Sequence, residues 1–196
     1  MRAYAVDLPP GASGPWTLET FVVPERSFAN FRLEMAGRGI SPGTYTRLCK
    51  SGTGVFMSDT PAEWRDCAYF VQQADGAVLI SGLGLGMVVK ALLAKATVTH
   101  VTVLENDPDV IALVAPYYAD ERLRVVEADA FAWKADRAFD WAWHDIWPDL
   151  CTDNIPEFSR LRRRYAKAMT APKRQHCWSE PQVLRQRRHD QRSGWW

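Results

Sequence analysis

The sequence predicts an α/β fold: a doubly wound, mostly parallel β-sheet preceded by a small N-terminal β-hairpin region. From residue 77 onward, short apolar runs alternate with helical segments at the spacing of βαβ units. The first run, 77–81, leads directly into three glycines at alternate positions, as when a strand turns sharply into a helix. Before residue 77 the pattern differs, with strand-like runs separated by a glycine-rich turn.

The length and composition favour one main domain. The chain has 196 residues, of which 47% are hydrophobic and 24% are charged, values typical of a protein with an ordinary core. We divide it into an N-terminal strand, hairpin and helix region (1–75), a nucleotide-binding domain (76–180) and a basic C-terminal tail (181–196).

Charge is distributed unevenly along the chain. From Cys151 onward there are 11 Lys and Arg residues against 4 Asp and Glu residues. Two interpretations stay open: the basic segment attracts an anionic partner such as a nucleic acid, or Arg162, Arg163 and Arg164 form the solvated face of a helix and pair with the acidic body. No nucleic-acid-binding motif accompanies these residues.

The sequence also bears on location and metals. It has no signal-peptide pattern at its start and no run of 18 apolar residues, so we expect a cytoplasmic protein without a membrane partner. The cysteines form no CxxC pair, and we predict no metal site. They are Cys49, Cys67, Cys151 and Cys177.

The N-terminal region is predicted to end in a helix. Before it, we expect a loose arm, a strand, a short helix and two hairpin strands at residues 1–15, 16–24, 27–35, 43–48 and 55–58. Thr60, Pro61 and Glu63 then match an N-cap, a first helical position and a capping box, and they predict a helix reaching about residue 73.

The following domain is predicted to alternate strands and helices. The expected strands are 77–81, 101–105, 123–127, 140–146 and 175–179, and the expected helices are 85–95, 108–118 and 154–169. We expect the fourth strand to lie beside the first, with a ligand crevice at their carboxyl ends. Few residues follow Met169, so the sheet is expected to be shortened at its C-terminal end. Its exposed edge, together with nine tryptophans, favours a homodimer.

The glycine turn and two carboxylates form the candidate ligand site. Gly82, Gly84 and Gly86 allow the backbone to approach a ligand closely. Glu105 ends the second strand at the distance from the glycines where an acidic residue accepts hydrogen bonds from ribose hydroxyls. Asp129 ends the third strand, where it either accepts a hydrogen bond from an adenine amino group or caps the next turn.

The fourth strand carries the candidate catalytic residue. Asp145 lies at the carboxyl end of this strand and is placed to meet the reacting centre. For His144 we favour packing on the far face of the sheet. Trp147 is expected near the site, where packing without a chemical role is the alternative.

These residues together resemble the class I S-adenosylmethionine-dependent methyltransferases, which have a Rossmann-like fold, and most closely the branch that includes the spermidine synthases. The resemblance covers residues 77–149. It implies S-adenosylmethionine as the cofactor, with the three glycines against its methionine part and ribose. Glu105 and its neighbour Asn106 would hold the ribose, and Asp129 and its neighbour Ala130 the adenine.

Departures from the spermidine synthases favour methyl transfer. Those enzymes carry an Asp inside the glycine turn, where this chain has Leu85, and the run Ile146-Trp147-Pro148 replaces small polar residues after Asp145. We therefore predict a methyltransferase with an unidentified small-molecule acceptor and Asp145 as its catalytic residue. Two alternatives stay open: an aminopropyltransferase or other sulfonium-using enzyme, and a non-catalytic module that binds S-adenosylmethionine.

Overall fold

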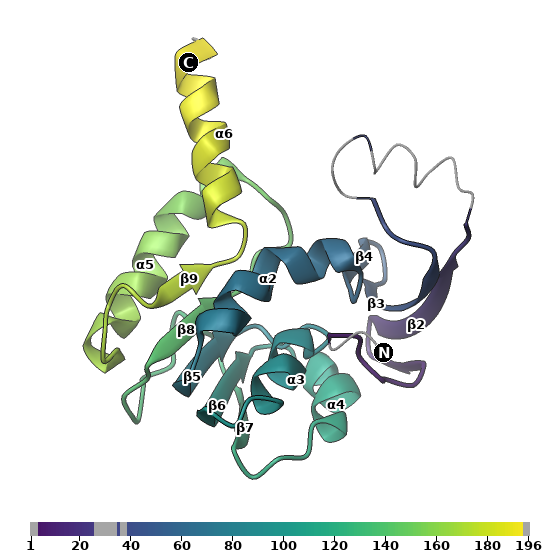
Figure 1. Cartoon of the computed structure of the whole chain (residues 1–196), viewed down its shortest axis with the longest axis horizontal. Helices are drawn as coiled ribbons and strands as arrows, with labels where there is room; N and C mark the ends of the chain where they lie inside the picture. Colours follow the sequence, from purple (N-terminus) through teal and green to yellow (C-terminus); the bar gives the residue numbers. More distant parts are fainter. Residues whose placement is uncertain (1–3, 26–34, 36–38, 194–196) are drawn as a thin grey trace.

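The computed structural model describes residues 4–25, 35 and 39–193, and it contains two β-sheets. The first is antiparallel, with four strands in the order β1-β2-β3-β4. The second has five strands in the order β7-β6-β5-β8-β9 (Figure 1). The predicted short helix at 27–35 lies outside the described residues except for Met35.

The N-terminal sheet contains the predicted hairpin. Its strands are β1 (Gly11–Ser13), β2 (Trp16–Val23), β3 (Gly43–Lys50) and β4 (Gly54–Ser58). The prediction of a loose arm over residues 1–15 is wrong, because β1 pairs antiparallel with β2 and the side chains of Val6 and Leu8 are buried. The glycine and proline residues of this segment favoured a loop prediction, although Val6 and Leu8 pack in the core.

Helix α2 (Pro61–Gln73) begins where predicted, with Thr60 at the N-cap and Pro61 in the first position. The predicted capping box is wrong, since the Thr60 side chain caps no backbone N–H. Its hydroxyl instead accepts a hydrogen bond from the Ser58 hydroxyl at 3.1 Å. The neighbouring Asp59 carboxylate accepts from the backbone N–H groups of Val6 and Thr46, so this corner joins the N-terminal segment to β3.

All neighbouring strands in the second sheet are parallel, as predicted. They are β5 (Gly76–Ser81), β6 (Val98–Glu105), β7 (Leu123–Glu127), β8 (Trp141–His144) and β9 (Gln175–Cys177). β8 lies beside β5, which confirms the predicted switch point between the first and fourth strands. The described sheet stops at five strands and is therefore short, as expected.

Helices cover both faces of this sheet. They and the short 3-10 turns are α3 (Met87–Leu93), α4 (Pro108–Val114), η1 (Ala115–Tyr117), η2 (Thr152–Asn154), α5 (Ile155–Tyr165), η3 (Ala166–Ala168) and α6 (Glu180–Ser193). α2, α3 and α4 pack on the face that carries Val78 and Ile80, whereas α5 and α6 pack on the face that carries Leu79 and Ala142. This alternation along β5 and β8 is what a sheet buried on both faces requires.

All three helices predicted in this domain are shorter than expected. α5 ends at Tyr165 and continues as the 3-10 turn η3. The other two are shortened for local reasons. α3 begins at Met87 because Gly86, in the left-handed conformation with φ +70°, occupies its N-cap. α4 ends at Val114 and continues as η1, in which Pro116 has no N–H to extend the α-helical hydrogen bonding.

The small sheet is attached to the start of α4. The Ser13 hydroxyl donates to Asp109 Oδ1 at 2.6 Å, and the Trp16 indole Nε1 donates to Asp107 Oδ2 at 2.7 Å. Asp107 is also the N-cap of α4, its side chain accepting from the Asp109 N–H. These bonds fix the sheet beside the carboxyl end of β6.

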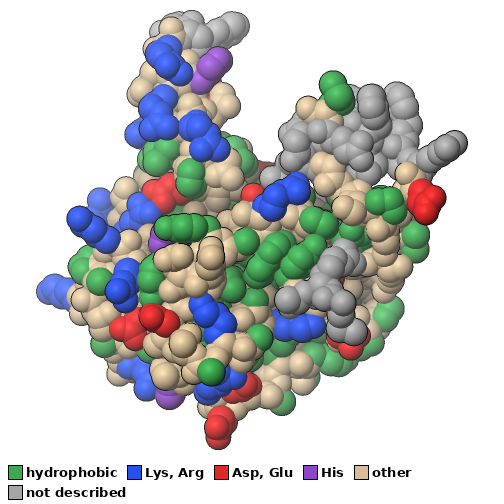
Figure 2. All heavy atoms as spheres, in the orientation of Figure 1, with side chains coloured by type: hydrophobic (Ala, Val, Ile, Leu, Met, Phe, Trp, Pro, Cys, Tyr) green, Lys and Arg blue, Asp and Glu red, His purple; other side chains and the backbone are tan. Residues whose placement is uncertain are grey.

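The segment expected as a basic tail is helical over most of its length. α6 projects outward from the body (Figure 1). Its first turns are anchored, because the Glu180 carboxylate pairs with Arg162 and Val183 is fully buried. Beyond them the surface is basic (Figure 2), with exposed Arg185, Arg187, Arg188 and Arg192. Within the described ranges no helix has the length and apolar character needed to cross a membrane.

Candidate functional site

A cavity of about 740 Å³ lies at the carboxyl edge of the parallel sheet, within the size range of ligand pockets. The loops after β5, β6, β7 and β8 line it, and the N-terminal sheet and α2 close it from the side. Seven of the residues predicted for the site line this cavity, namely Gly82, Gly84, Glu105, Asn106, Asp129, Ala130 and Asp145. Gly86 belongs to the same turn but not to the cavity lining.

Each glycine of the turn has a positive φ and a close neighbour. A Cβ on Gly82 would lie 2.1 Å from the Asp145 carbonyl oxygen, and one on Gly84 would lie 2.5 Å from Met57 Sδ. At Gly86 the obstacle is the ring of Tyr118, at 2.2 Å. Gly86 therefore shapes the turn through packing, whereas the other two border the cavity itself.

Glu105 is held in a fixed orientation by three backbone N–H groups. One carboxylate oxygen accepts from Leu83 at 2.9 Å, and the other accepts from Asn106 at 2.9 Å and Asp107 at 3.0 Å. The residue is only 9% exposed. A carboxylate offers about four acceptor positions, so Glu105 ties the glycine turn to β6 and still has capacity for a ligand in the cavity.

Asp129 caps a turn and also lines the cavity. Its Oδ1 accepts from the Phe131 N–H at 2.7 Å, which is the capping role considered for it. The residue is exposed, so a ligand in the cavity can reach the carboxylate. Ala130 is buried next to it, and its carbonyl accepts from the Tyr165 hydroxyl at 2.6 Å. The capping and ligand-binding roles are therefore compatible.

Asp145 is a partly buried carboxyl group beside other carboxylates. Burial, which is the largest cause, and the negative charges of Glu63 and Asp66 on α2 together raise the pKa of Asp145 to about 7, while a hydrogen bond from the indole N–H of Trp143 acts in the opposite direction. Glu63 lines the same cavity from the first turn of α2. Such a group can both accept and release a proton near neutral pH.

His144 and Trp147 lie where the sequence analysis predicted them. His144 is fully buried on the far face, with Nδ1 2.9 Å from the Ser81 hydroxyl and its ring stacked on Tyr165. Burial lowers the pKa of His144 to about 4, so it is neutral and takes no part in the cavity. Trp147 lines the cavity and donates from Nε1 to Glu157 Oε2 at 2.6 Å.

The cavity is rich in negative charge. Among its described lining residues Lys50 is the one Lys or Arg, and its Nζ lies 4.7 Å from the centre of the Trp16 ring. The lining carboxylates are Glu63, Glu105, Asp107, Asp129, Asp145 and Glu157. A site of this composition favours a ligand that carries positive charge.

Several solved structures are similar to part of this chain. No protein-family model matches the chain, and no curated protein matches its sequence. An S-adenosylmethionine-dependent methyltransferase from Mesorhizobium loti is 17% identical, over 55% of this chain and 48% of that one, with a TM-score of 0.45. The complex of DhpI with SAM and HEP is 21% identical, over 56% and 52%, with a TM-score of 0.43.

A third similar structure is the N-methyltransferase NodS from Bradyrhizobium japonicum WM9. It is 12% identical over 54% of this chain and 56% of that one, with a TM-score of 0.41. The match therefore spans about half the length of each of these structures.

Sequence reasoning missed one wall of the cavity. Trp16, Lys50, Phe56 and Met57 come from the N-terminal sheet, and no motif marks them because their position depends on how that sheet packs on α4. Trp143 was also missed, although a signal was present. It precedes Asp145 by two residues, and strand alternation places both side chains on one face.

Proposed function

We propose that the chain binds S-adenosylmethionine in this cavity and transfers its methyl group to an acceptor beside Asp145. One observation carries the proposal: a single carboxylate-rich cavity brings the glycine turn, the oriented Glu105 and Asp129 together with Asp145. The sulfonium and ammonium groups of S-adenosylmethionine outweigh its carboxylate, so the ligand carries the positive charge that this cavity favours.

The residues have distinct proposed roles. Glu105 and Asn106 bind the ribose, and Asp129 accepts from the adenine amino group with Ala130 beneath it. Gly82 and Gly84 let the backbone approach the ribose and methionine parts, and Gly86 keeps the turn in shape through its contact with Tyr118.

The bound sulfonium supplies an activated methyl group. Methyl transfer is an in-line displacement, so the protein contributes mainly by holding the acceptor in position. Asp145 orients the acceptor and removes its proton, and the walls formed by the N-terminal sheet and α2 restrict the access of water to the cavity.

Calorimetry with S-adenosylmethionine and S-adenosylhomocysteine tests the binding proposal. We expect Glu105→Ala to weaken both affinities by at least about tenfold, because an oriented acceptor of ribose hydrogen bonds is lost. Glu127→Ala is the matched control, since Glu127 ends the neighbouring strand opposite Glu105 in register, is exposed and does not line the cavity. Melting curves report whether either variant is misfolded. Unchanged affinity in a folded Glu105→Ala protein would reject the ribose role.

Two further outcomes separate the alternatives. Binding without methyl transfer to any acceptor would favour a non-catalytic module. Incubation with decarboxylated S-adenosylmethionine and putrescine tests aminopropyl transfer. We expect no spermidine, because Leu85 is buried in the core where aminopropyltransferases place an acidic residue.

A further inference from the structure

The indole nitrogen of Trp143 is a buried donor in the cavity wall. Trp143 is 4% exposed, and among the described residues its Nε1 is the one buried side-chain nitrogen or oxygen without a hydrogen-bond partner of normal geometry. The acceptor that its N–H does influence is the Asp145 carboxyl, whose pKa it lowers. Folded proteins rarely leave such a group unpaired, and an exception calls for an explanation such as a missing ligand. Here a group bound in the cavity that Trp143 and Asp145 both line would complete the pairing of this donor.

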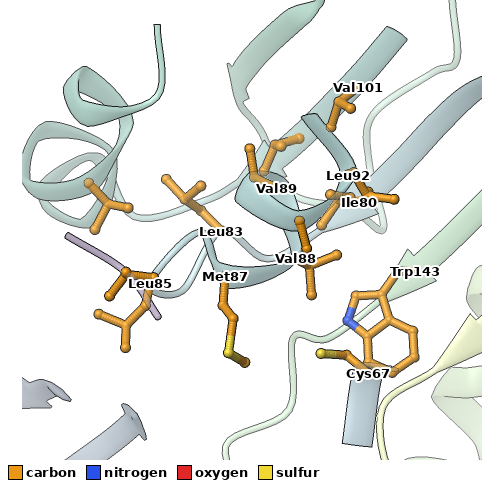
Figure 3. Packing of buried hydrophobic residues seen from close by; sticks show 14 of the residues in the cluster. Cys67, Ile80, Leu83, Leu85, Met87, Val88, Val89, Leu92, Val101 and Trp143 are labelled. Atoms are coloured by element: carbon orange, nitrogen blue, oxygen red, sulfur yellow. The ribbon is translucent and has the colours of Figure 1, made fainter. Parts of the chain in front are cut away.

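The donor lies next to the proposed catalytic carboxyl group. Trp143 and Asp145 are two positions apart at the end of β8, so their side chains share the face opposite to His144. The indole nitrogen of Trp143 is turned toward Met87 and Val88, which also line the cavity (Figure 3). A hydrogen-bond donor and a hydrogen-bond acceptor therefore stand together on one wall.

Trp141 shows that the unpaired state is particular to Trp143. It occupies the same face of β8, two residues earlier, but its Nε1 donates to Asp75 Oδ1 at 2.9 Å. It also does not line the cavity. The indole of Trp141 is thus paired outside the cavity, whereas the indole of Trp143 lies in the cavity wall.

The indole N–H of Trp143 and the carboxyl group of Asp145 together determine which chemical group can bind against both of them. A hydroxyl oxygen can accept from Nε1, donate its proton to the carboxylate and still use its other lone pair for attack. An ammonium group has no lone pair for the indole N–H, and a neutral amine needs its single lone pair for attack. A carboxylate or phosphate is disfavoured by Glu63, Asp145 and Glu157 in the lining.

We propose that the methyl acceptor is the hydroxyl group of a flat, uncharged aromatic ring of the phenol class, bound against both Nε1 of Trp143 and the carboxylate of Asp145. This proposal rests on the proposed function. The oxygen–methyl bond forms as the sulfur–methyl bond breaks, the hydroxyl proton passes to Asp145, and S-adenosylhomocysteine is released. Trp147 and Trp178 also line the cavity and supply aromatic side chains for contact with the ring.

Two further observations support this assignment. The backbone N–H of Trp178 donates to the backbone carbonyl of His144 at 2.8 Å, which places Trp178 beside the end of β8. The raised pKa of Asp145, about 7, keeps this group able to take up a proton at neutral pH, and phenols are the hydroxyl compounds whose acidity comes closest to that range.

NMR spectra of the indole N–H groups test whether phenol binds beside Trp143. The spectra are recorded on protein saturated with S-adenosylhomocysteine. Phenol, aniline and toluene are titrated in parallel as isosteric probes. We expect phenol to shift the Trp143 resonance and to bind at least about tenfold more tightly than the other two. Trp143→Phe should remove this preference, and the control Trp141→Phe should keep it. Equal binding of aniline, an unmoved Trp143 resonance, or no binding of phenol would each overturn the proposal.

Turnover separates this proposal from the proposed function. With methyl-labelled S-adenosylmethionine, phenol should yield anisole, and Asp145→Asn should lower kcat by about a hundredfold or more with a smaller change in KM. Methylation of aniline in preference to phenol would overturn the hydroxyl assignment while leaving a methyltransferase in place. Failure to bind S-adenosylhomocysteine at all would instead reject the proposed function.

Discussion

Asp145 is a residue whose ionisation opposes folding. Its pKa rises from 3.8 to about 7 in the folded protein, so between about pH 4 and pH 7 the unfolded chain loses this proton while the folded chain keeps it. The contribution of Asp145 to stability therefore falls as the pH rises through that window. The contribution of His144 to stability has the opposite pH dependence, because the pKa of His144 is lowered in the folded protein. The effect of Asp145 is therefore measured as a difference between two variants at each pH.

We predict that Asp145→Asn is more stable than the unmodified protein above about pH 7. Allowing for water in the cavity, the gain should be about 2 kcal/mol, and it should vanish below about pH 3, where the carboxyl is neutral in both states. Urea unfolding at a series of pH values measures it. Asp149→Asn, which removes an exposed carboxyl from the same loop, controls for the loss of charge alone. A pH-independent difference would contradict the shifted pKa.

Residue identities predicted part of the site because backbone constraints leave a mark in the sequence. A turn with positive φ at Gly82, Gly84 and Gly86 selects glycine, and Glu105 follows at the spacing of a βαβ unit. Gly86 shows the limit of this inference. Its conformation follows from the sequence pattern, but its contact with Tyr118 across the fold does not.

At the level of elements, the parallel strands were predictable and the N-terminal sheet's position was not. Continuous apolar runs identify β5 and β6 wherever they lie in space, because both faces are buried. The side of the cavity formed by β3 and β4 depends on two long-range bonds, from Ser13 and Trp16 to the start of α4. Single polar residues of this kind give no periodic signal in a sequence.

Trp16→Phe tests whether this attachment matters for the cavity. The variant keeps an aromatic ring but leaves Asp107, the N-cap of α4, without the indole donor. We predict a loss of stability of about 1–2 kcal/mol, together with weaker binding of S-adenosylhomocysteine. Unfolding curves and calorimetry measure the two effects, with Trp141→Phe as the control that loses an indole bond away from the cavity. If Trp16→Phe and Trp141→Phe bind S-adenosylhomocysteine equally well, the hydrogen bond from Trp16 to Asp107 does not hold this side of the cavity in position.

For the molecule as a whole, the predicted homodimer now has a candidate surface. β9 forms one edge of the parallel sheet, and His176 on it lies within an aromatic group that includes Trp141 and Tyr69. Tyr69 is 65% exposed at the surface of α2. A sheet edge next to an exposed aromatic side chain is a surface that proteins usually cover.

We predict that the chain is a dimer in solution and that Tyr69→Glu makes it monomeric. The reason is that a charge at this position would have to be buried without a partner if two edges met there. Sedimentation across a concentration series measures the mass. Tyr117→Glu is the matched control, because Tyr117 is 51% exposed in η1, on a segment that follows α4 and lies away from β9 in the sheet order. A monomeric unmodified protein would exclude the dimer, and dissociation by both variants would mean that the contact lies elsewhere.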